Sequence, residues 1–310
     1  MPHYLRLLTR ESALALTQAN LVKAALEQAQ SGLTVELRPV KALGDKYRDR
    51  WEEFARTNDR AALTKRKWTF ELEEAIANGE AELAVHSAKD LPLEIRAETA
   101  LLPVLQRADP RDVFIGKHDR FAKLPDGARI GTDSKRRRAQ LLRLRPALQV
   151  VPHDGNVPTR LAKLDASTTL DGIVLAAAGL ARLGLTRPMT DYFAPAEFVP
   201  AAHQGMLAAQ YHAGNAWLAG LLQQISDVHT HTAWLAERAA IVALEADCET
   251  AIGAWARVEG AQLHLLVRGL APDGSRSIEE QASAPLAEAE SLGQRVAETL
   301  LQRGIREVLR

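Results

Sequence analysis

Short apolar runs alternate with helical segments along the chain, and this alternation constrains the fold more than any other feature. An apolar run over residues 4–8 leads into a segment, 13–30, in which leucines and alanines recur at helical spacing. A second strand is expected over residues 33–40, and residues 172–176 form the continuous apolar run of a strand buried on both faces. Strands that alternate with helices through short links predict parallel or mixed α/β sheets.

Polar residues directly follow one of the expected strands, in the stretch Val85-His86-Ser87-Ala88-Lys89-Asp90-Leu91-Pro92. Because the strand ends near Val85 and the stretch stops at Pro92, Lys89 and Asp90 are expected on the loop at the strand's carboxyl end. Ligands bind at that edge of open α/β sheets. A lysine beside an aspartate offers an anion contact and a carboxylate for proton transfer. A solvated loop with a Lys/Asp pair is the alternative interpretation.

A second polar stretch, Gly131-Thr132-Asp133-Ser134, precedes four basic residues, Lys135-Arg136-Arg137-Arg138. This pattern predicts a helix that begins with Asp133 or Ser134 as its cap. Free backbone N–H groups at a helix start, next to arginines, form an anion site, although a solvated basic helix face is the alternative. Arg160 and Arg182 also fall just past the ends of expected elements.

The length of 310 residues predicts two or three domains, each with its own core. Residues 109–112 are rich in turn formers, so a domain boundary is expected near residue 106. Residues 44–67 are polar and aperiodic, which predicts a long loop, and a loop of this length is usually functional or disordered. Trp68 is expected to begin a helix.

The carboxyl-terminal part of the chain has a different pattern. Residues 201–206 are expected to open a helix, and residues 232–246 form a long amphipathic helix. Residues 252–258 and 262–270 are expected to pair as a hairpin, and residues 286–301 to form the final helix. This part is therefore expected to be a separate α+β unit.

Composition excludes several classes of function. The 39 basic and 39 acidic residues balance, so no overall field favours nucleic acid or an anionic membrane. Cys248 is the only cysteine, which rules out an intramolecular disulfide and is typical of a reducing compartment. The sequence has no secretion signal, no membrane-length apolar run and no metal-spaced His/Cys cluster. A cytoplasmic protein without a metal is expected.

Seven short segments, weak singly but strong as an ordered set, resemble the hydroxymethylbilane synthase family, also called porphobilinogen deaminase. They are Thr9-Arg10-Glu11-Ser12, Val85 to Asp90, Gly131 to Arg137, Gly155-Asn156-Val157 with Arg160, Ala178-Gly179-Leu180 with Arg182, Gln204-Gly205, and Leu244-Glu245 with Cys248 and Ile252-Gly253.

The resemblance implies an α/β fold of three domains. The first two are expected to be like type II periplasmic binding proteins with mixed sheets, and the third to be a small α+β domain that carries the cofactor cysteine. On this sequence the first domain would cover residues 1–105 and 199–220, the second 106–198 and the third 221–310. A monomer is expected.

The resemblance also implies a transferase of tetrapyrrole (porphyrin and heme) biosynthesis. The family expels ammonia from porphobilinogen to form an azafulvene, which the terminal pyrrole of the growing chain attacks; four such steps and a hydrolysis give linear hydroxymethylbilane. A dipyrromethane primer would be held through a thioether on Cys248. Asp90, with Lys89, would be catalytic, since a carboxylate there bonds pyrrole N–H groups and assists the leaving amine.

Each pyrrole carries two carboxylates, which guanidinium groups bind bidentately. The resemblance assigns primer binding to Ser134, Arg136, Arg137 and Lys89. It assigns substrate binding to Arg10, Ser12, Lys65, Arg160, Arg182 and Gln204.

This chain departs from the family pattern at several positions. Asp154 stands where arginine is usual, Pro158 and His203 where glycine is common, and Ala246-Asp247 where two glycines are usual. Two other functions therefore stay open. One is a diverged homologue that binds pyrrole carboxylates, makes a different or shorter oligopyrrole, or is inactive. The other is an anion-binding protein without a primer.

Overall fold

The computed structural model describes residues 3–47, 67–246 and 250–310, and it divides the chain into two compact units. Unit 1 consists of Met1–Arg107 and Met206–His231, and unit 2 of Ala108–Gly205 and Thr232–Arg310. Each unit is therefore built from two separate stretches of the chain.

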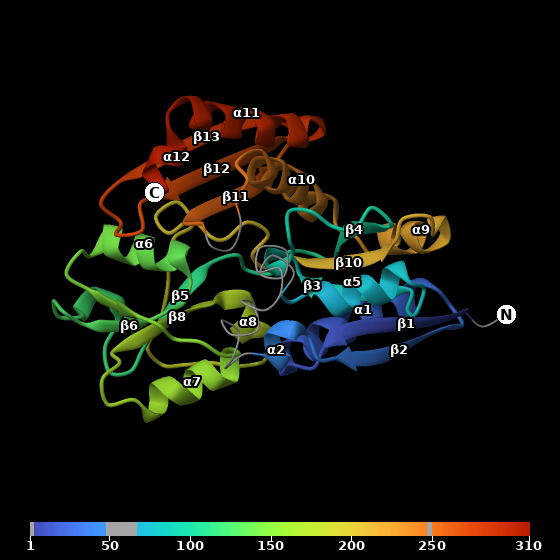
Figure 1. Cartoon of the computed structure of the whole chain (residues 1–310), viewed down its shortest axis with the longest axis horizontal. Helices are drawn as coiled ribbons and strands as arrows, with labels where there is room; N and C mark the ends of the chain where they lie inside the picture. The colour runs from blue at the N-terminus through green and yellow to red at the C-terminus, as the bar shows by residue number, and fades with distance from the viewer. Residues whose placement is uncertain (1–2, 48–66, 247–249) are drawn as a thin grey trace. The chain divides into compact units, whose positions relative to one another are not determined.

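Unit 1 contains a five-stranded sheet in the order β2-β1-β3-β10-β4 (Figure 1). Strand β1 is parallel to β2 and β3, whereas β10 runs antiparallel to both β3 and β4. The strands are β1 (His3–Arg10), β2 (Leu33–Val40), β3 (Leu83–Ser87), β4 (Thr99–Val104) and β10 (Leu207–His212). The helices are α1 (Ala13–Ala29), α2 (Leu43–Lys46), α5 (Phe70–Ala77), α9 (Ala216–Gln224) and the 3-10 turn η2 (Ala88–Asp90).

Both faces of this sheet are buried, which explains its continuous apolar strands. Leu7 on β1 packs in one core cluster with residues of α1 and α9. The next residue, Leu8, points to the opposite face and packs with Leu72 and Ile76 of α5. Successive side chains of a strand alternate between faces, so one strand serves both cores.

Unit 2 contains a second five-stranded sheet, in the order β7-β6-β8-β5-β9. Three strands are parallel (β7, β6, β8), and β5 is antiparallel to β8 and β9. The strands are β5 (Asp112–Gly116), β6 (Arg129–Gly131), β7 (Gln149–Val151), β8 (Gly172–Ala176) and β9 (Thr190–Tyr192). The helices are η3 (Phe121–Lys123), α6 (Lys135–Leu144), α7 (Val157–Ala166) and α8 (Ala177–Arg182).

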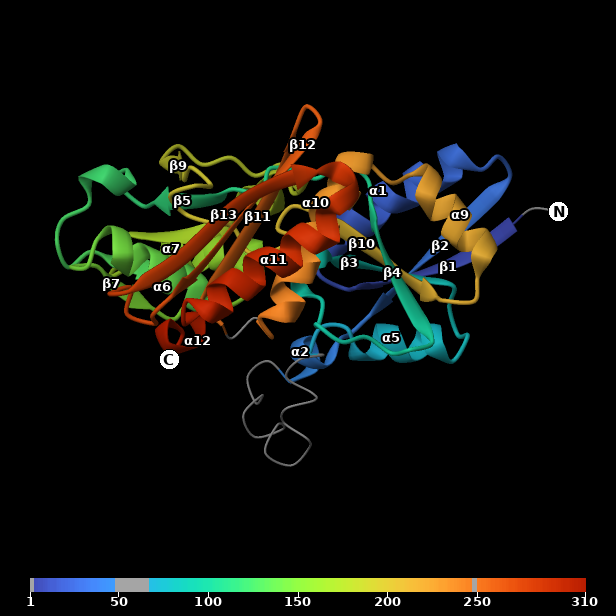
Figure 2. The same ribbon diagram turned by 90° about the horizontal axis from the view of Figure 1, so that it is seen from above.

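A three-stranded antiparallel sheet, β11-β12-β13, completes unit 2. Helix α11 lies along this sheet and buries Leu292, Val296 and Leu300 (Figure 2). Gly293 lets α11 approach α10 closely, because a Cβ there would lie 2.3 Å from the carbonyl oxygen of Ala236. Helix α10 (Val228–Ala243) begins in unit 1 and passes into unit 2 at Thr232. The other elements are β11 (Ile252–Glu259), β12 (Gln262–Leu270), β13 (Ser277–Pro285), η4 (Leu286–Glu288), α11 (Ala289–Gln302) and α12 (Ile305–Val308).

The expected fold class is confirmed. Both five-stranded sheets have the same mixed order, with three parallel strands followed by an antiparallel strand, and the third sheet is small. The hairpin over residues 252–270 and the final helix are also present.

The expected helix at residues 201–206 is wrong. His203 and Gly205 have φ angles of 61° and 91°, in the left-handed region that cannot continue a right-handed helix. The segment turns instead, and β10 begins at Leu207. A glycine, usual in the family at position 203, would adopt this backbone without strain.

Candidate active site

The carboxyl ends of β1 and β3 lie at one edge of the unit 1 sheet, because these two strands are adjacent and parallel. Arg10 ends β1, and its guanidinium carbon lies 4.1 Å from the centre of a Trp68 ring, a cation–π distance. Ser12 caps α1: its hydroxyl oxygen accepts a hydrogen bond from the Ala15 N–H at 3.3 Å. Lys89 and Asp90 follow β3 in the turn η2, and both are half-buried. The expected location of Lys89 and Asp90 past the carboxyl end of a strand is confirmed, whereas Arg10 lies in β1 itself and not in the loop that follows it.

A buried polar network fixes the end of β3, and sequence reasoning missed it. The His86 ring nitrogen Nε2 lies 3.1 Å from the side-chain oxygen of Gln210, whose amide nitrogen donates to the Thr99 hydroxyl at 2.9 Å and to Glu73 Oε1 at 3.2 Å. Burial lowers the pKa of His86 to about 4, so the ring is neutral at neutral pH. Polar side chains inside otherwise apolar strands were the available signal.

In unit 2, the ends of the three parallel strands carry the other predicted residues. Ser134 follows β6, Arg160 follows β7 in helix α7, and Arg182 follows β8 at the end of α8. Parallel strands end at the same edge, so this is the ligand edge of the sheet. Ser134 is the N-cap of α6, and its hydroxyl accepts from the Arg137 N–H at 3.4 Å.

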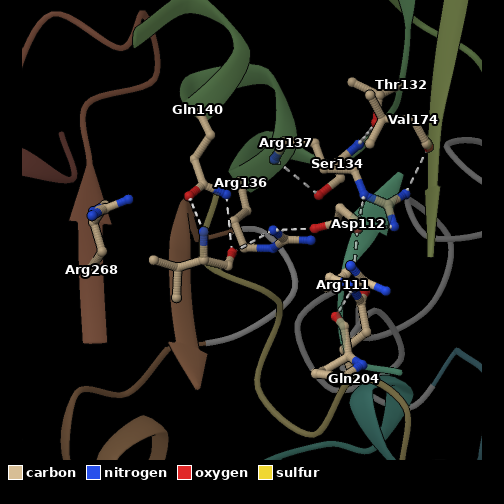
Figure 3. A network of polar contacts seen from close by, with 12 residues as sticks. Arg111, Asp112, Thr132, Ser134, Arg136, Arg137, Gln140, Val174, Gln204 and Arg268 are labelled. Atoms are coloured by element: carbon tan, nitrogen blue, oxygen red, sulfur yellow. Dashed lines mark hydrogen bonds and ion pairs between the residues drawn. The ribbon is translucent and has the colours of Figure 1, made fainter. Parts of the chain in front are cut away.

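Three of the predicted residues converge on Asp112, the first residue of β5, whose side chain is fully buried (Figure 3). Arg137 donates from Nε and Nη2 to Asp112 Oδ1, at 2.9 and 2.7 Å. Arg136 Nη1 forms an ion pair with Oδ2 at 2.8 Å, and the Gln204 amide donates to Oδ1 at 3.1 Å. Sequence reasoning did not single out Asp112.

The same arginines are held by backbone carbonyls as well. Arg137 Nη1 donates to the Val174 carbonyl at 3.0 Å, and Arg136 Nη1 donates to the Val199 carbonyl at 2.7 Å. Gln140 fixes Val199 by two hydrogen bonds to its backbone (Figure 3). Burial lowers the pKa of Arg136, and the nearby Asp112 charge opposes that shift. The first turn of α6 is therefore held by several hydrogen bonds and carries two cationic side chains.

Arg160 is oriented by the loop that precedes α7. Its Nε donates to the Gly155 carbonyl at 2.7 Å, and Gly155 has a φ of 115°, which favours glycine. The buried His153 ring contacts the Arg160 carbonyl through Nε2 at 2.9 Å. Burial lowers the pKa of His153, so this ring is a neutral N–H donor.

Arg182 is a half-buried cation. Its Nη2 donates to the Gly205 carbonyl at 2.7 Å, and within the described residues no carboxylate lies at ion-pair distance from it. Burial alone lowers the pKa of Arg182 to about 10. A half-buried guanidinium is costly without a counterion, so Arg182 is suited to bind an anion.

Asp154, which replaces the family's arginine, is exposed and forms an ion pair with Lys163 of α7. The hydrogen bond from Lys163 lowers the pKa of Asp154. The carboxylate is therefore ionised, but its charge is balanced locally.

Asp154→Arg is expected to keep the fold, at a cost below about 1 kcal/mol in unfolding free energy, because exposed ion pairs contribute little. It is expected to raise kcat/KM for porphobilinogen several-fold, by adding a guanidinium beside Arg160. Steady-state kinetics and thermal unfolding check both parts. Asp154→Asn separates the removal of the negative charge from the gain of the positive one. A fall in kcat/KM for Asp154→Arg would contradict the expectation.

Lys65 and Cys248 lie outside the described residues. The described chain next to the cysteine packs on α6: Ala251 shares a buried cluster with Ala139 and Leu270. In the described part of the chain, no group of three or more His, Cys, Asp or Glu side chains could hold a metal. Among those same residues, no helix has the length and apolar character needed to cross a membrane.

Comparisons with known proteins identify the family of this chain. The family model "Porphobilinogen deaminase, dipyromethane cofactor binding domain" matches residues 5–219, and "Porphobilinogen deaminase, C-terminal domain" matches residues 231–302. Porphobilinogen deaminase of Geobacter metallireducens is 40% identical over 99% of this chain and 94% of that protein. The enzyme of Geobacter sulfurreducens is 41% identical over 98% and 93%.

Among solved structures, the methionine-binding protein MetQ has a TM-score of 0.42 and 14% identity over 79% of this chain and 95% of its own. The two family models together match most of the sequence. The resemblance expected from the ordered segments is confirmed, and this chain belongs to the porphobilinogen deaminase family.

Proposed function

We propose that this chain is a hydroxymethylbilane synthase, a transferase of tetrapyrrole biosynthesis that joins porphobilinogen units into linear hydroxymethylbilane. In each condensation the aminomethyl C–N bond of one porphobilinogen breaks, and the protonated amine leaves as ammonia. A C–C bond forms to the α-carbon of the terminal pyrrole, which then loses its proton. The observation that carries the proposal is the set of arginines at the sheet edge of unit 2, because porphobilinogen is a dicarboxylate.

The residues of unit 2 fit a carboxylate-bearing dipyrromethane. Arg136 and Arg137 share the carboxylate of Asp112, so the part of this buried cluster that the structure describes has two positive charges and one negative. A carboxylate of the primer would balance the second positive charge. Cys248 would hold the primer covalently, and the bound primer supplies the nucleophilic pyrrole carbon from which the product grows. Ser134 and Lys89 would complete its binding.

Asp90 is proposed as the catalytic carboxylate and Lys89 as its cationic neighbour. The turn η2 is anchored by its own backbone, since the Ala88 N–H donates to the Met206 carbonyl at 3.1 Å. The preceding Ser87 hydroxyl is hydrogen-bonded to the Gln18 amide at 3.0 Å. A carboxylate held in this way can accept pyrrole N–H bonds and stabilise the cation that forms as ammonia leaves, without reorganising at that moment.

Arg10, Ser12, Lys65, Arg160, Arg182 and Gln204 are proposed to bind the substrate carboxylates. Two members of this set, Arg182 and Gln204, are expected to contribute in different ways. Arg182 has no acidic partner among the described residues, whereas the Gln204 amide is hydrogen-bonded to the Pro110 carbonyl and to Asp112. Gln204 would therefore act mainly by holding Asp112. A monomeric state and a cytoplasmic location remain predictions from the sequence.

Arg182→Leu is expected to lower kcat/KM for porphobilinogen by about ten- to a hundredfold, since charge-assisted hydrogen bonds contribute about 1.5–3 kcal/mol. The unfolding temperature is not expected to fall, because the substitution removes a half-buried charge without a counterion. Arg187→Leu is the matched control, as Arg187 pairs with Asp165 on the surface. A stability loss without a kinetic effect would assign Arg182 a structural role.

The proposed function is tested by incubating the purified protein with porphobilinogen. Substrate consumption, ammonia release and hydroxymethylbilane formation are followed together, and intact-mass measurement records any covalent adduct. The expected result is turnover by protein whose mass exceeds that of the chain by two linked pyrrole units. An adduct without turnover would favour the hypothesis that this chain is a diverged homologue that binds pyrrole carboxylates. An unmodified, inactive protein would exclude the proposed function.

A further inference from the structure

Asp112 lies at the centre of the buried cluster in Figure 3, yet it is not among the residues expected to touch primer or substrate. Its two oxygens have different partners. Oδ1 accepts two hydrogen bonds from Arg137 and one from Gln204. Oδ2 faces Arg136 Nη1 at 2.8 Å. One carboxylate therefore sets the positions of two guanidinium groups that come from consecutive residues of α6.

Arg136 keeps donors for a second anion. Within the described residues its hydrogen bond and its ion pair both use Nη1, and Asp112 is the one carboxylate at ion-pair distance from it. Arg137, in contrast, uses Nε, Nη1 and Nη2 in bonds to Asp112 and the Val174 carbonyl. The two adjacent arginines thus differ: Arg137 is held on three nitrogens, and Arg136 on one.

We propose that Asp112 is a positioning residue for primer binding: its Oδ2 holds Arg136 with Nε and Nη2 available to a carboxylate of the dipyrromethane, while its Oδ1 locks Arg137 in place. The inference rests on the proposed function. It distinguishes the two primer-binding arginines, since Arg136 keeps two nitrogens for the primer while Arg137 is held on three. Arg136 is therefore the residue through which Asp112 acts.

Asp112→Asn is expected to disturb the contact to Arg136 while it keeps the contacts to Arg137. The side-chain oxygen of Asn can accept the three bonds made to Oδ1, but its NH2 group then replaces Oδ2 and faces Arg136 Nη1, donor against donor. The opposite orientation places the NH2 group against three donors, which is worse. The substitution is therefore expected to release Arg136 while it leaves Arg137 bound.

The experiment measures how fast primer-free protein gains the dipyrromethane mass when it is incubated with porphobilinogen. Asp112→Asn is expected to slow this gain at least about tenfold relative to the parent, since a charge-assisted contact to the primer is lost. Asp109→Asn is the matched control, because Asp109 pairs with Arg111 and, within the described residues, with neither Arg136 nor Arg137. It is expected to load at the parental rate.

A double-variant cycle distinguishes positioning from a general loss of stability. Asp112→Asn combined with Arg136→Gln is expected to load no more slowly than Arg136→Gln alone, because both changes remove one interaction. If Asp112→Asn alone fails to fold, the double variant is used to test the inference. It lacks the contact between the Asn NH2 group and the Arg136 guanidinium that the single variant creates. Folding of each variant is checked by thermal unfolding, and loading is compared per folded molecule.

Three results would overturn the inference: parental loading by folded Asp112→Asn, equal slowing by Asp109→Asn, or additive slowing in the double variant. A double variant that stays unfolded while Arg136→Gln folds would also overturn it. Failure of the parent protein to gain the adduct would instead refute the proposed function, so the two failures are separable.

Discussion

Asp90→Asn is expected to lower kcat by at least about a hundredfold, a typical contribution of a positioned acid–base group, while KM changes little. The fall in kcat is expected to exceed the change in KM because the negative charge of Asp90 acts mainly in the transition state. Free porphobilinogen has a neutral pyrrole ring, and positive charge develops on that ring only as ammonia leaves. A carboxylate beside it therefore stabilises the transition state more than the ground state, which raises kcat rather than affinity.

The substitution should leave both the fold and the primer in place. Asp90 is half-buried at the end of η2, and the turn is held by backbone contacts of Ala88 rather than by the Asp90 side chain. Asparagine has nearly the same shape. Thermal unfolding and intact mass are therefore expected to match the parent protein.

Glu94→Gln is the matched control, since Glu94 is an exposed carboxylate four residues further along the same segment. It is expected to keep full kcat. Survival of turnover within a few-fold in Asp90→Asn would show that Asp90 is a loop residue without a catalytic role. An equal fall in both variants would point to a general charge effect on this loop.

The sequence predicted those parts of the site that depend on local pattern. Ser134 caps α6 because its hydroxyl reaches the N–H three residues later, a signature that needs no tertiary information. Lys89, Arg160 and Arg182 lie past strand ends. Their positions could be predicted because the length of each strand and the polar residues after it can be recognised in the sequence. Local pattern thus located the ligand edges of both sheets.

The sequence did not predict the partners that meet across the fold. Asp112 lies in a turn-rich stretch, and its arginines are 24 and 25 residues away in sequence, so nothing local marks it as a buried counterion. His86 and Gln210 lie on adjacent strands but are 124 positions apart. Contacts of this kind depend on strand order, which residue pattern alone does not determine.

Two errors arise because residue pattern alone does not show which faces of a strand are buried. The run Met206 to Ala209 is fully buried on both faces of a central strand, and such a run cannot be told from a buried helix by periodicity. Strand β13, Ser277–Pro285, was missed for the opposite reason: most of its side chains are exposed or half-exposed and polar. It is an edge strand whose outer face is not apolar, so its pattern resembles a loop.

Cys248→Ala is expected to abolish the covalent adduct completely, and turnover with it. Cys248 is the only cysteine of the chain, so no other thiolate can form the thioether. Where the described chain resumes, Ala251 is buried in one cluster with Ala139 of α6, the helix whose first turn carries Arg136 and Arg137. Loss of the adduct therefore need not disturb the arginine cluster, and the variant is expected to fold.

Intact-mass measurement checks the prediction, together with the colour that pyrroles give with an acidic aldehyde reagent. Cys248→Ser is the matched control for shape: its hydroxyl is a far weaker nucleophile than a thiolate, so it is expected to behave like Cys248→Ala. Retention of the mass excess in either variant would place the primer on another residue. Full turnover by adduct-free Cys248→Ala would show that condensation starts from free pyrrole, and that the arginine cluster binds substrate instead of a resident primer.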